Sequence, residues 1–296
     1  MPKVLALTNA VVGVTDLEKS LGYYQGVLGL KVVDRVRDKV YLASVSGAEA
    51  LVLEQAPAAQ CKGLRFQLAP ASDMKEVLGE LVKRGIKAEL RSDPHPQVAE
   101  SVAFFDLNGF HVELTDQVHC SPPSLGSGIA PLRLGHIALV VPDAKLSSQY
   151  YGELLGFRVA DWVGEFFVFM RCGPEHHTVN FLQAPATAVH HIAFEVRNSA
   201  HLNASCDQLA GVGIGIIWGP VRHGPGHNIA TYHKNADGHL VELFTEMDVI
   251  RHEELGYYDP RPWHADRPQR PKVWSTGRPR DIWGPPPPEN FLLGNL

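Results

Sequence analysis

The chain has 296 residues, of which 45% are hydrophobic and 20% charged, a balance that excludes disordered and fibrous proteins and suits one large or two medium domains. The formal net charge is −5 and the pI is near 6.3, so the overall charge does not favour binding to nucleic acid. The longest uncharged apolar stretch, residues 209–221, is well short of the ~20 residues that a membrane-spanning helix needs. The N-terminus has no secretory cleavage pattern, and we expect a cytoplasmic protein.

The chain contains an internal repeat with an offset of 127 to 129 residues. Residues 15–33 resemble residues 142–159, and in each segment an Asp precedes a Gly by 13 residues with a Tyr-Tyr pair between them. Residues 108–115 likewise resemble residues 237–245. A repeat of this length indicates two structurally similar halves.

Within each half the apolar pattern predicts two copies of a βαβββ unit. The elements expected in chain order are a strand at 65–68, a helix from Asp73 to about Arg84 and strands to Thr115, then a strand at 134–141, a helix from Asp143 to near Gly156, a strand at 190–196, a helix from Asn198 to Ala210, and strands at 214–218, 228–233 and 239–244. Four such modules predict an α+β fold.

Composition marks the limits of these halves. Residues 120–131 are rich in Pro, Gly and Ser, which is typical of a linker. We therefore expect an N-terminal domain at 1–120 and a C-terminal domain at 131–250. Residues 251–296 depart from the repeat and contain four consecutive prolines and three tryptophans, Trp263, Trp274 and Trp283. This composition predicts an extended tail that packs on the second domain or on a neighbouring subunit.

The sequence has no phosphate-binding loop, hydrolase nucleophile elbow or HExxH zinc motif, and its four cysteines form no CxxC pair, so its fifteen histidines are the most informative residues. The second half has His136 and His191 at the positions where the first half has Asn9 and Gly63, and both halves have a Glu at the position of Glu242. Two imidazoles and one carboxylate, with coordination positions left open, suit a non-haem Fe(II) ion. We therefore expect one metal per chain, held in the second half.

Residues 221–242, VRHGPGHNIATYHKNADGHLVE, together with LGHIALVVPD and HHIAFEV, resemble the type I extradiol ring-cleaving dioxygenases of the vicinal oxygen chelate superfamily. The resemblance covers about residues 4 to 248. It implies that the four modules pair into two barrel-like domains, that the N-terminal domain holds no metal, and that the C-terminal domain is catalytic.

The resemblance also implies roles for individual residues. His136, His191 and Glu242 would bind the metal, which is Fe(II) with Mn(II) as the alternative. The catalytic residues would be His223, Tyr232 and an acid/base histidine, for which His177 is preferred to His176 because strand alternation turns only one of the pair inward. His176, His227 and Trp218 would contact the substrate.

The implied reaction is extradiol cleavage of a catechol-type aromatic with both atoms of O2, giving a 2-hydroxymuconic semialdehyde-type product. The expected partners are this substrate and O2, and we expect a homo-oligomer, a dimer or a tetramer. Family members that take acidic catechols commonly have an Arg at the position of Trp218, so a hydrophobic or aryl substituent is expected here. Arg261 or Arg278 from the tail could instead reach the site and bind an acidic group.

Two other functions remain open. The first is another metal enzyme of the superfamily, a glyoxalase-like isomerase, which would favour ligands from two repeats and two carboxylates. The second is a non-catalytic binding protein of the superfamily, which would not need His136, His191 and Glu242 together.

Overall fold

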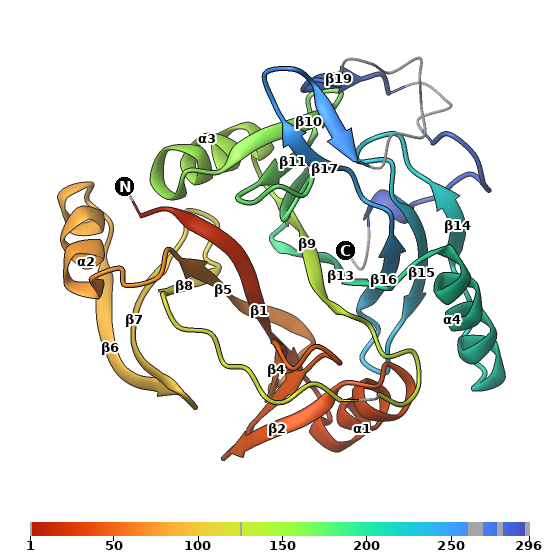
Figure 1. Ribbon diagram of the computed structural model, residues 1–296, viewed down its shortest axis with the longest axis horizontal. Helices are drawn as coiled ribbons and strands as arrows, with labels where there is room; N and C mark the ends of the chain where they lie inside the picture. Colours follow the sequence, from red (N-terminus) through yellow and green to blue (C-terminus); the bar gives the residue numbers. More distant parts are fainter. Residues whose placement is uncertain (1, 125, 260–268, 277–280, 294–296) are drawn as a thin grey trace. The chain divides into compact units, whose positions relative to one another are not determined.

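The computed structural model describes residues 2–124, 126–259, 269–276 and 281–293 (Figure 1). Its contacts divide the chain into two compact units. Unit 1 consists of residues 1–134, 150–156 and 235–238, and unit 2 consists of residues 135–149, 157–234 and 239–296. Each unit is built around its own sheet.

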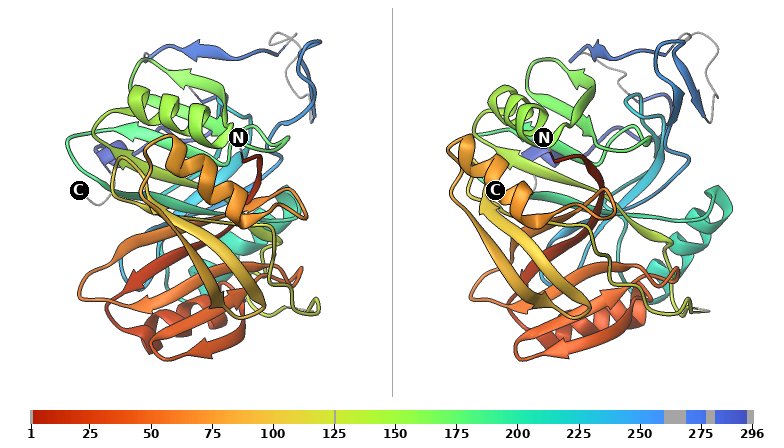
Figure 2. Two further views of the ribbon diagram at one scale, coloured as in Figure 1. Left: turned by 90° about the vertical axis from the view of Figure 1, so that its left-hand side faces the viewer. Right: turned by 60° about the vertical axis from the view of Figure 1, so that its left-hand side comes forward.

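The first half of the chain forms the sheet of unit 1. Its elements are β1 (Val4–Val14), α1 (Leu17–Gly22), η1 (Tyr23–Val27), β2 (Lys31–Val36), β3 (Lys39–Ala43), β4 (Glu49–Gln55), β5 (Gln60–Leu68), α2 (Met74–Lys83), β6 (Ala88–His95), β7 (Val98–Phe105) and β8 (His111–Thr115). Among the described residues the strand order is β2-β3-β4-β1-β5-β8-β7-β6. The carboxylates of Asp16 and Asp73 cap α1 and α2 by accepting backbone N–H groups of the first turn. Figure 2 shows α2, in orange, lying over β6 and β7.

The second half forms the corresponding sheet of unit 2. Its elements are β9 (Arg133–Val141), α3 (Ala144–Leu155), β10 (Arg158–Val163), β11 (Phe167–Arg171), β12 (Val179–Gln183), β13 (Ala188–Glu195), α4 (Ser199–Gly211), β14 (Trp218–Arg222), β15 (Ile229–Lys234), β16 (Leu240–Thr245), β17 (Val249–His252), β18 (Tyr257–Asp259), β19 (Lys272–Trp274) and η3 (Phe291–Leu293). In the described part of the chain the order is β14-β15-β16-β13-β9-β12-β11-β10-β19, and β17 pairs with β18. Helix α4 packs against β15 and β16 (Figure 1).

The predicted α+β fold of four βαβββ modules is confirmed. In each module the last strand pairs in parallel with the first, as β1 does with β4, β5 with β8, β9 with β12 and β13 with β16. One strand was predicted in the wrong place, because residues 214–217 precede β14, which begins only at Trp218 opposite Tyr232 of β15. The backbone leaves α4 through Gly213 at φ +75°, and Ile216 and Ile217 are more than a third exposed. The exposed apolar residues at 214–217 therefore have a strand-like sequence pattern although they precede the strand.

The described parts of residues 251–296 belong to unit 2. Strand β19 pairs in parallel with β10, and Trp283 forms an isolated bridge with Arg222. Trp263, Arg261 and Arg278 lie outside the described residues. Among the helices that the structure describes, none is long and apolar enough to cross a membrane.

Unit 1 buries a charged cluster around β1, β5 and β8, the strands that correspond to those of the predicted metal ligands. The Arg65 guanidinium lies 2.9 Å from a carboxylate oxygen of Glu49 and 3.7 Å from one of Glu113. Asn9 donates a hydrogen bond to Glu49, and His95 Nε2 lies 2.7 Å from Glu113. Burial would raise the pKa of Glu113, but His95 and Arg65 lower it to about 2. Arg65 thus supplies positive charge that two buried carboxylates require.

Replacing Arg65 should therefore destabilise unit 1. Arg65→Met leaves Glu49 and Glu113 buried without the guanidinium, and we expect the free energy of unfolding to fall by ~3–5 kcal/mol in urea denaturation followed by circular dichroism. The matched control is Arg91→Met, whose exposed pairing with Glu89 should contribute less than ~1 kcal/mol. Equal losses in the two variants would contradict a structural role for the Arg65 cluster.

Candidate metal centre

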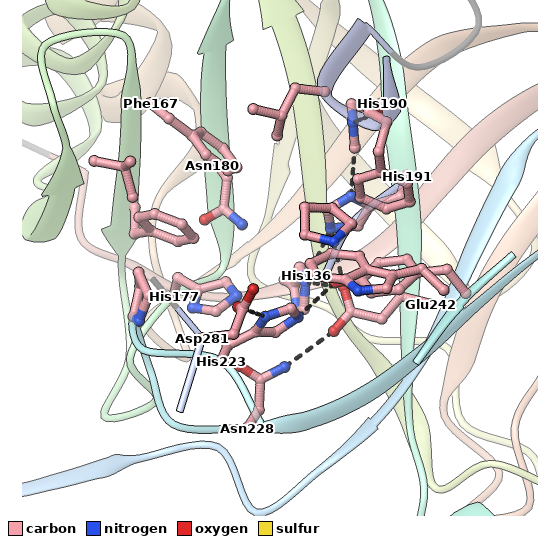
Figure 3. Close-up of a pocket in the computed structure, with 18 residues that line it drawn as sticks. His136, Phe167, His177, Asn180, His190, His191, His223, Asn228, Glu242 and Asp281 are labelled. Atoms are coloured by element: carbon pink, nitrogen blue, oxygen red, sulfur yellow. Dashed lines mark hydrogen bonds and ion pairs between the residues drawn. The ribbon is translucent and has the colours of Figure 1, made fainter. Parts of the chain in front are cut away.

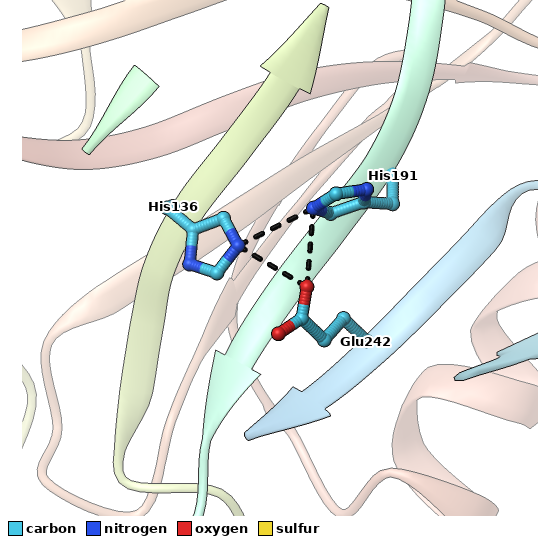
Figure 4. Close-up of side chains that lie close together, drawn as sticks. All are labelled: His136, His191 and Glu242. Carbon is cyan, nitrogen blue, oxygen red and sulfur yellow. Dashed lines mark hydrogen bonds and ion pairs between the residues drawn. The ribbon is translucent and has the colours of Figure 1, made fainter. Parts of the chain in front are cut away.

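Three buried side chains of unit 2 converge on one point. His136 extends from β9, His191 from β13 and Glu242 from β16 (Figure 4). The parallel register of β13 and β16 places Ala193 opposite Glu242, and His191, two residues earlier, projects from the same face as Ala193. The two imidazole Nε2 atoms are 3.3 Å apart, and Glu242 Oε2 lies 3.2 Å from His136 Nε2 and 3.1 Å from His191 Nε2.

These distances fit a single transition-metal ion. A point equidistant from three atoms about 3.2 Å apart lies about 1.85 Å from each, close to the ~2.0–2.2 Å at which imidazole and carboxylate bind a transition metal. All three residues are at most 5% exposed. Burial lowers the pKa of His136, whereas the neighbouring His136 and His191 overcome the effect of burial on Glu242 and hold its pKa well below the usual range. The trio therefore offers two imidazole nitrogens and one carboxylate oxygen as donors to a single ion.

Asn228 orients the carboxylate of this trio. Its Nδ2 donates to Glu242 Oε1 over 3.0 Å, which leaves Oε2 directed at the two imidazoles (Figure 3). Asn228 is 1% exposed, so this hydrogen bond is shielded from water.

The trio opens into a pocket of about 670 Å³, including the open space at its mouth (Figure 3). Besides the trio, the lining consists of Val163, Phe167, Phe169, His177, Asn180, His190, Trp218, His223, Pro225, Asn228, Tyr232, Asp281, Pro287, Phe291 and Leu292. Neither Lys nor Arg occurs among these described lining residues. The pocket therefore combines an apolar wall with a few polar groups near the trio, as is typical of sites for small molecules.

A hydrogen-bonded chain lies on one side of the pocket. Asp281 Oδ1 is 2.8 Å from His223 Nδ1, and His223 Nε2 is 2.9 Å from the Tyr232 hydroxyl. Because a carboxylate only accepts, His223 donates to Asp281 from Nδ1, and its Nε2 is the atom that contacts the Tyr232 hydroxyl. Burial and the charge of Glu242 raise the pKa of Tyr232 well above its usual value, so the phenol keeps its proton.

A second chain reaches His177. Asp161 Oδ2 lies 3.2 Å from His176 Nε2, and the Nδ1 atoms of His176 and His177 are 3.0 Å apart. By the same reasoning His176 donates to Asp161 and accepts from His177 Nδ1, which leaves a lone pair on His177 Nε2. Burial and the neighbouring His136 hold the pKa of His177 well below its usual value, so the ring is neutral.

Of the three residues predicted to contact the substrate, Trp218 belongs to the described pocket lining and His176 and His227 do not. Trp218 lines the pocket, stacks on Tyr232 with ring centroids 5.1 Å apart, and donates its indole N–H to the carbonyl of Pro285. His176 and His227 are absent from the described lining because their rings are held behind it by Asp161 and Asp248. The pair at 176 and 177 is thus separated into one residue at the pocket and one behind it.

Sequence reasoning missed several residues of this site. Asn228, Asp281 and Phe291 line the pocket, yet none belongs to a recognisable ligand pattern. His190, directly before a predicted ligand, could have been noticed as half of a His-His pair like that at 176 and 177. Asp281 is 58 residues from the His223 that it contacts, and local sequence carries no sign of that pairing.

Comparison with known proteins agrees with this geometry. The sequence matches the family described as Glyoxalase/Bleomycin resistance protein/Dioxygenase superfamily over residues 6–117 and 133–243. It is 26% identical over 282 residues to a 2,2',3-trihydroxybiphenyl dioxygenase of Sphingomonas paucimobilis, covering 87% of this chain and 91% of the relative. It is 22% identical over 285 residues to a manganese-dependent 2,3-dihydroxybiphenyl 1,2-dioxygenase of Geobacillus genomosp. 3, covering 88% and 90%.

A solved structure extends the likeness to the fold. The substrate complex of homoprotocatechuate 2,3-dioxygenase from Brevibacterium fuscum, with 3,4-dihydroxyphenylacetate, has a TM-score of 0.83 and 26% identity, and the alignment covers 99% of this chain and 92% of that one. The family match spans most of both halves of the repeat, and the chain belongs to the glyoxalase/bleomycin resistance protein/dioxygenase superfamily.

Proposed function

We propose that this protein is an extradiol dioxygenase that cleaves the ring of a catechol with both atoms of O2, using Fe(II) or, alternatively, Mn(II) held by His136, His191 and Glu242. The observation that carries the proposal is the open face of this trio, which looks into a mainly apolar pocket lined by His177, His223 and Tyr232. Relatives named as extradiol dioxygenases align over most of the chain and support the same reaction.

The donor set explains the role of the ion. Two neutral imidazoles and one carboxylate leave a divalent ion with a net charge of +1 and open positions, at which it would bind a catecholate and O2 side by side. Such a site favours an anionic, chelating substrate over a neutral one.

The surrounding side chains would handle protons and charge. His177 presents an Nε2 lone pair to the pocket and can accept a proton from a catechol hydroxyl, then return it to oxygen later in the reaction. The protonated Tyr232 hydroxyl, positioned by His223, would donate to negative charge on a substrate oxygen and stabilise it by ~2–4 kcal/mol. The apolar wall excludes water, which strengthens these interactions.

The isomerase alternative is less well supported by this arrangement. The trio draws one carboxylate from unit 2, whereas the corresponding carboxylate of unit 1, Glu113, contacts Arg65 and His95. A binding protein would have no need for three buried ligand side chains with converging atoms.

The direct test is turnover of a 3-substituted catechol by protein reconstituted anaerobically with Fe(II) and then exposed to air. We expect O2 uptake matched one to one by a yellow ring-fission product, loss of both with a chelator, and recovery with Fe(II) or Mn(II). Catechol binding without O2 uptake would favour the binding protein, and turnover of a glutathione thiohemiacetal in its place would favour the isomerase.

Metal binding should depend on unit 2 alone. His136→Ala, His191→Ala and Glu242→Ala should each lose bound iron and turnover, because a facial site with two donors is too weak to retain the ion. Glu113→Ala is the matched control and should keep both. The measurement is the iron content of each purified variant by mass spectrometry. Retention of iron by Glu242→Ala together with its loss in Glu113→Ala would overturn the assignment of the metal ligands.

The proton-handling residues should affect rate rather than metal content. His177→Phe, His223→Phe and Tyr232→Phe should keep iron while kcat falls by ~10²–10⁴-fold for groups used in proton transfer. The comparison of His177→Phe with His176→Phe is the sharpest, because only the former removes an imidazole from the pocket wall. An unchanged kcat in His177→Phe with a large loss in His176→Phe would reverse the two roles.

The pocket further suggests a preference for catechols with hydrophobic or aryl substituents. Trp218 and Phe291 both line the pocket and pack edge-on with ring centroids 4.6 Å apart, and the described lining has no Lys or Arg to pair with a carboxylate. Asp281 adds negative charge to the same wall. Burying an acidic substituent there without a partner would cost several kcal/mol.

This preference is measured by kcat/KM for 3-phenylcatechol against 3,4-dihydroxyphenylacetate. We expect at least a tenfold advantage for the aryl catechol, and Trp218→Ala should reduce that advantage while Trp274→Ala, on β19, should not. Equal values for the two substrates, or a preference for the acid, would contradict this view of the pocket.

A further inference from the structure

His190, directly before the proposed ligand His191, connects that ligand to Phe291. Phe291 lies in the last described part of the chain, residues 281–293, called here the C-terminal segment. The Nδ1 atoms of the two rings are 2.7 Å apart (Figure 3). His190 Nε2 lies 3.0 Å from the backbone carbonyl of Phe291. Both histidines are at most 5% exposed. Neighbouring residues of a strand normally point to opposite faces, so this ring-to-ring contact is an unusual local arrangement.

The Phe291 carbonyl determines which atoms donate and which accept in the hydrogen bonds that join it to His190 and His191. A carbonyl oxygen can only accept, so the proton of neutral His190 must be on Nε2. His190 Nδ1 then carries a lone pair and accepts from His191 Nδ1–H. The lone pair of His191 is consequently on Nε2, the atom that faces His136 and Glu242.

Packing of the Phe291 ring holds the backbone carbonyl that His190 contacts in place. The Phe291 ring packs edge-on against Trp218, Tyr232 and His190, with centroid distances of 4.6, 5.0 and 5.5 Å. Trp218 in turn donates to the carbonyl of Pro285, six residues earlier in the same segment. The C-terminal segment is therefore held both at Pro285 and at Phe291, the residue that contacts His190.

We propose that His190 is a positioning residue that links the Phe291 carbonyl to His191 and holds the His191 ring in the tautomer and orientation that bind the metal. This rests on the proposed metal site but not on the reaction carried out there. Groups that orient metal-binding histidines typically change metal affinity 10–100-fold when removed. The C-terminal segment, far from the ligands in sequence, would thus contribute to metal affinity.

The test compares two substitutions at position 190 by titration of metal-free protein with Mn(II), following free Mn(II) by electron paramagnetic resonance. His190→Phe fills the space but cannot accept from His191, and we expect its Kd for Mn(II) to rise by ~10–100-fold. His190→Gln can accept with its oxygen and donate with its nitrogen, and it should restore affinity to within about threefold. His252→Phe, at an exposed histidine of β17, is the control and should bind like the unmodified protein.

Two outcomes would overturn the proposal: unchanged affinity in His190→Phe, or equal losses in His190→Phe and His190→Gln, which would indicate packing alone. A measurement on the unmodified metal-free protein avoids any folding defect of the variants. Long-range ¹H–¹⁵N spectra should show His190 protonated at Nε2 and His191 at Nδ1, and the opposite tautomers would refute the chain. None of these readouts involves catechol or O2, so they can succeed or fail independently of the proposed reaction.

Discussion

The convergence of three buried donor atoms is the constraint on which the site depends. Two imidazole nitrogens and a carboxylate oxygen lie within 3.1 to 3.3 Å of one another and are removed from water, so positive charge, as an imidazole proton shared with Glu242 or as a metal ion, must lie between them. A divalent ion would supply that charge. Strands β9, β13 and β16 bring the three side chains together.

Unit 1 balances its buried carboxylates with a charged side chain of its own. Its corresponding strands carry Asn9, Gly63 and Glu113 in place of the two histidines and the glutamate, and the Arg65 guanidinium lies among buried carboxylates. The position that corresponds to Arg65 in the repeat is Ala193, next to the proposed metal site. A permanent cation from the chain itself thus balances unit 1, whereas unit 2 keeps that position small.

Three histidines that line the pocket are each oriented by a contact between the ring Nδ1 and a neighbouring group. His223 is backed by Asp281, His177 by His176 and Asp161, and His191 by His190 and the Phe291 carbonyl. Each chain ends in an oxygen that can only accept; His177 and His191 thereby direct Nε2 at the site, whereas Nε2 of His223 lies 2.9 Å from the Tyr232 hydroxyl. The oxygens of Asp281 and Phe291 come from the C-terminal segment, which connects that segment to both the proposed ligand and the proposed proton-handling groups.

Local chemistry explains which features could be predicted from the sequence. Helices that begin at Asp73 and Asn198 were predictable because a side-chain cap is a local signal, and His136, His191 and Glu242 stood out against their partners in the repeat. The start of β14 was not, since exposed Ile216 and Ile217 imitate a strand and only pairing with β15 decides where it begins. Asp281 and Phe291 depend on contacts across 58 and 101 residues, for which a single sequence has no local sign.

The central claim is that the protein, with a metal that would be held by His136, His191 and Glu242, inserts both atoms of O2 into a catechol ring. Incubation of the Fe(II)-loaded protein with 3-phenylcatechol under ¹⁸O₂, followed by mass spectrometry with rapid quenching, tests it most directly. The account predicts a ring-opened product with the mass of the catechol plus one dioxygen, carrying oxygen-18 from both atoms before exchange with water. An unlabelled quinone, or catechol recovered intact while iron stays bound, would contradict it.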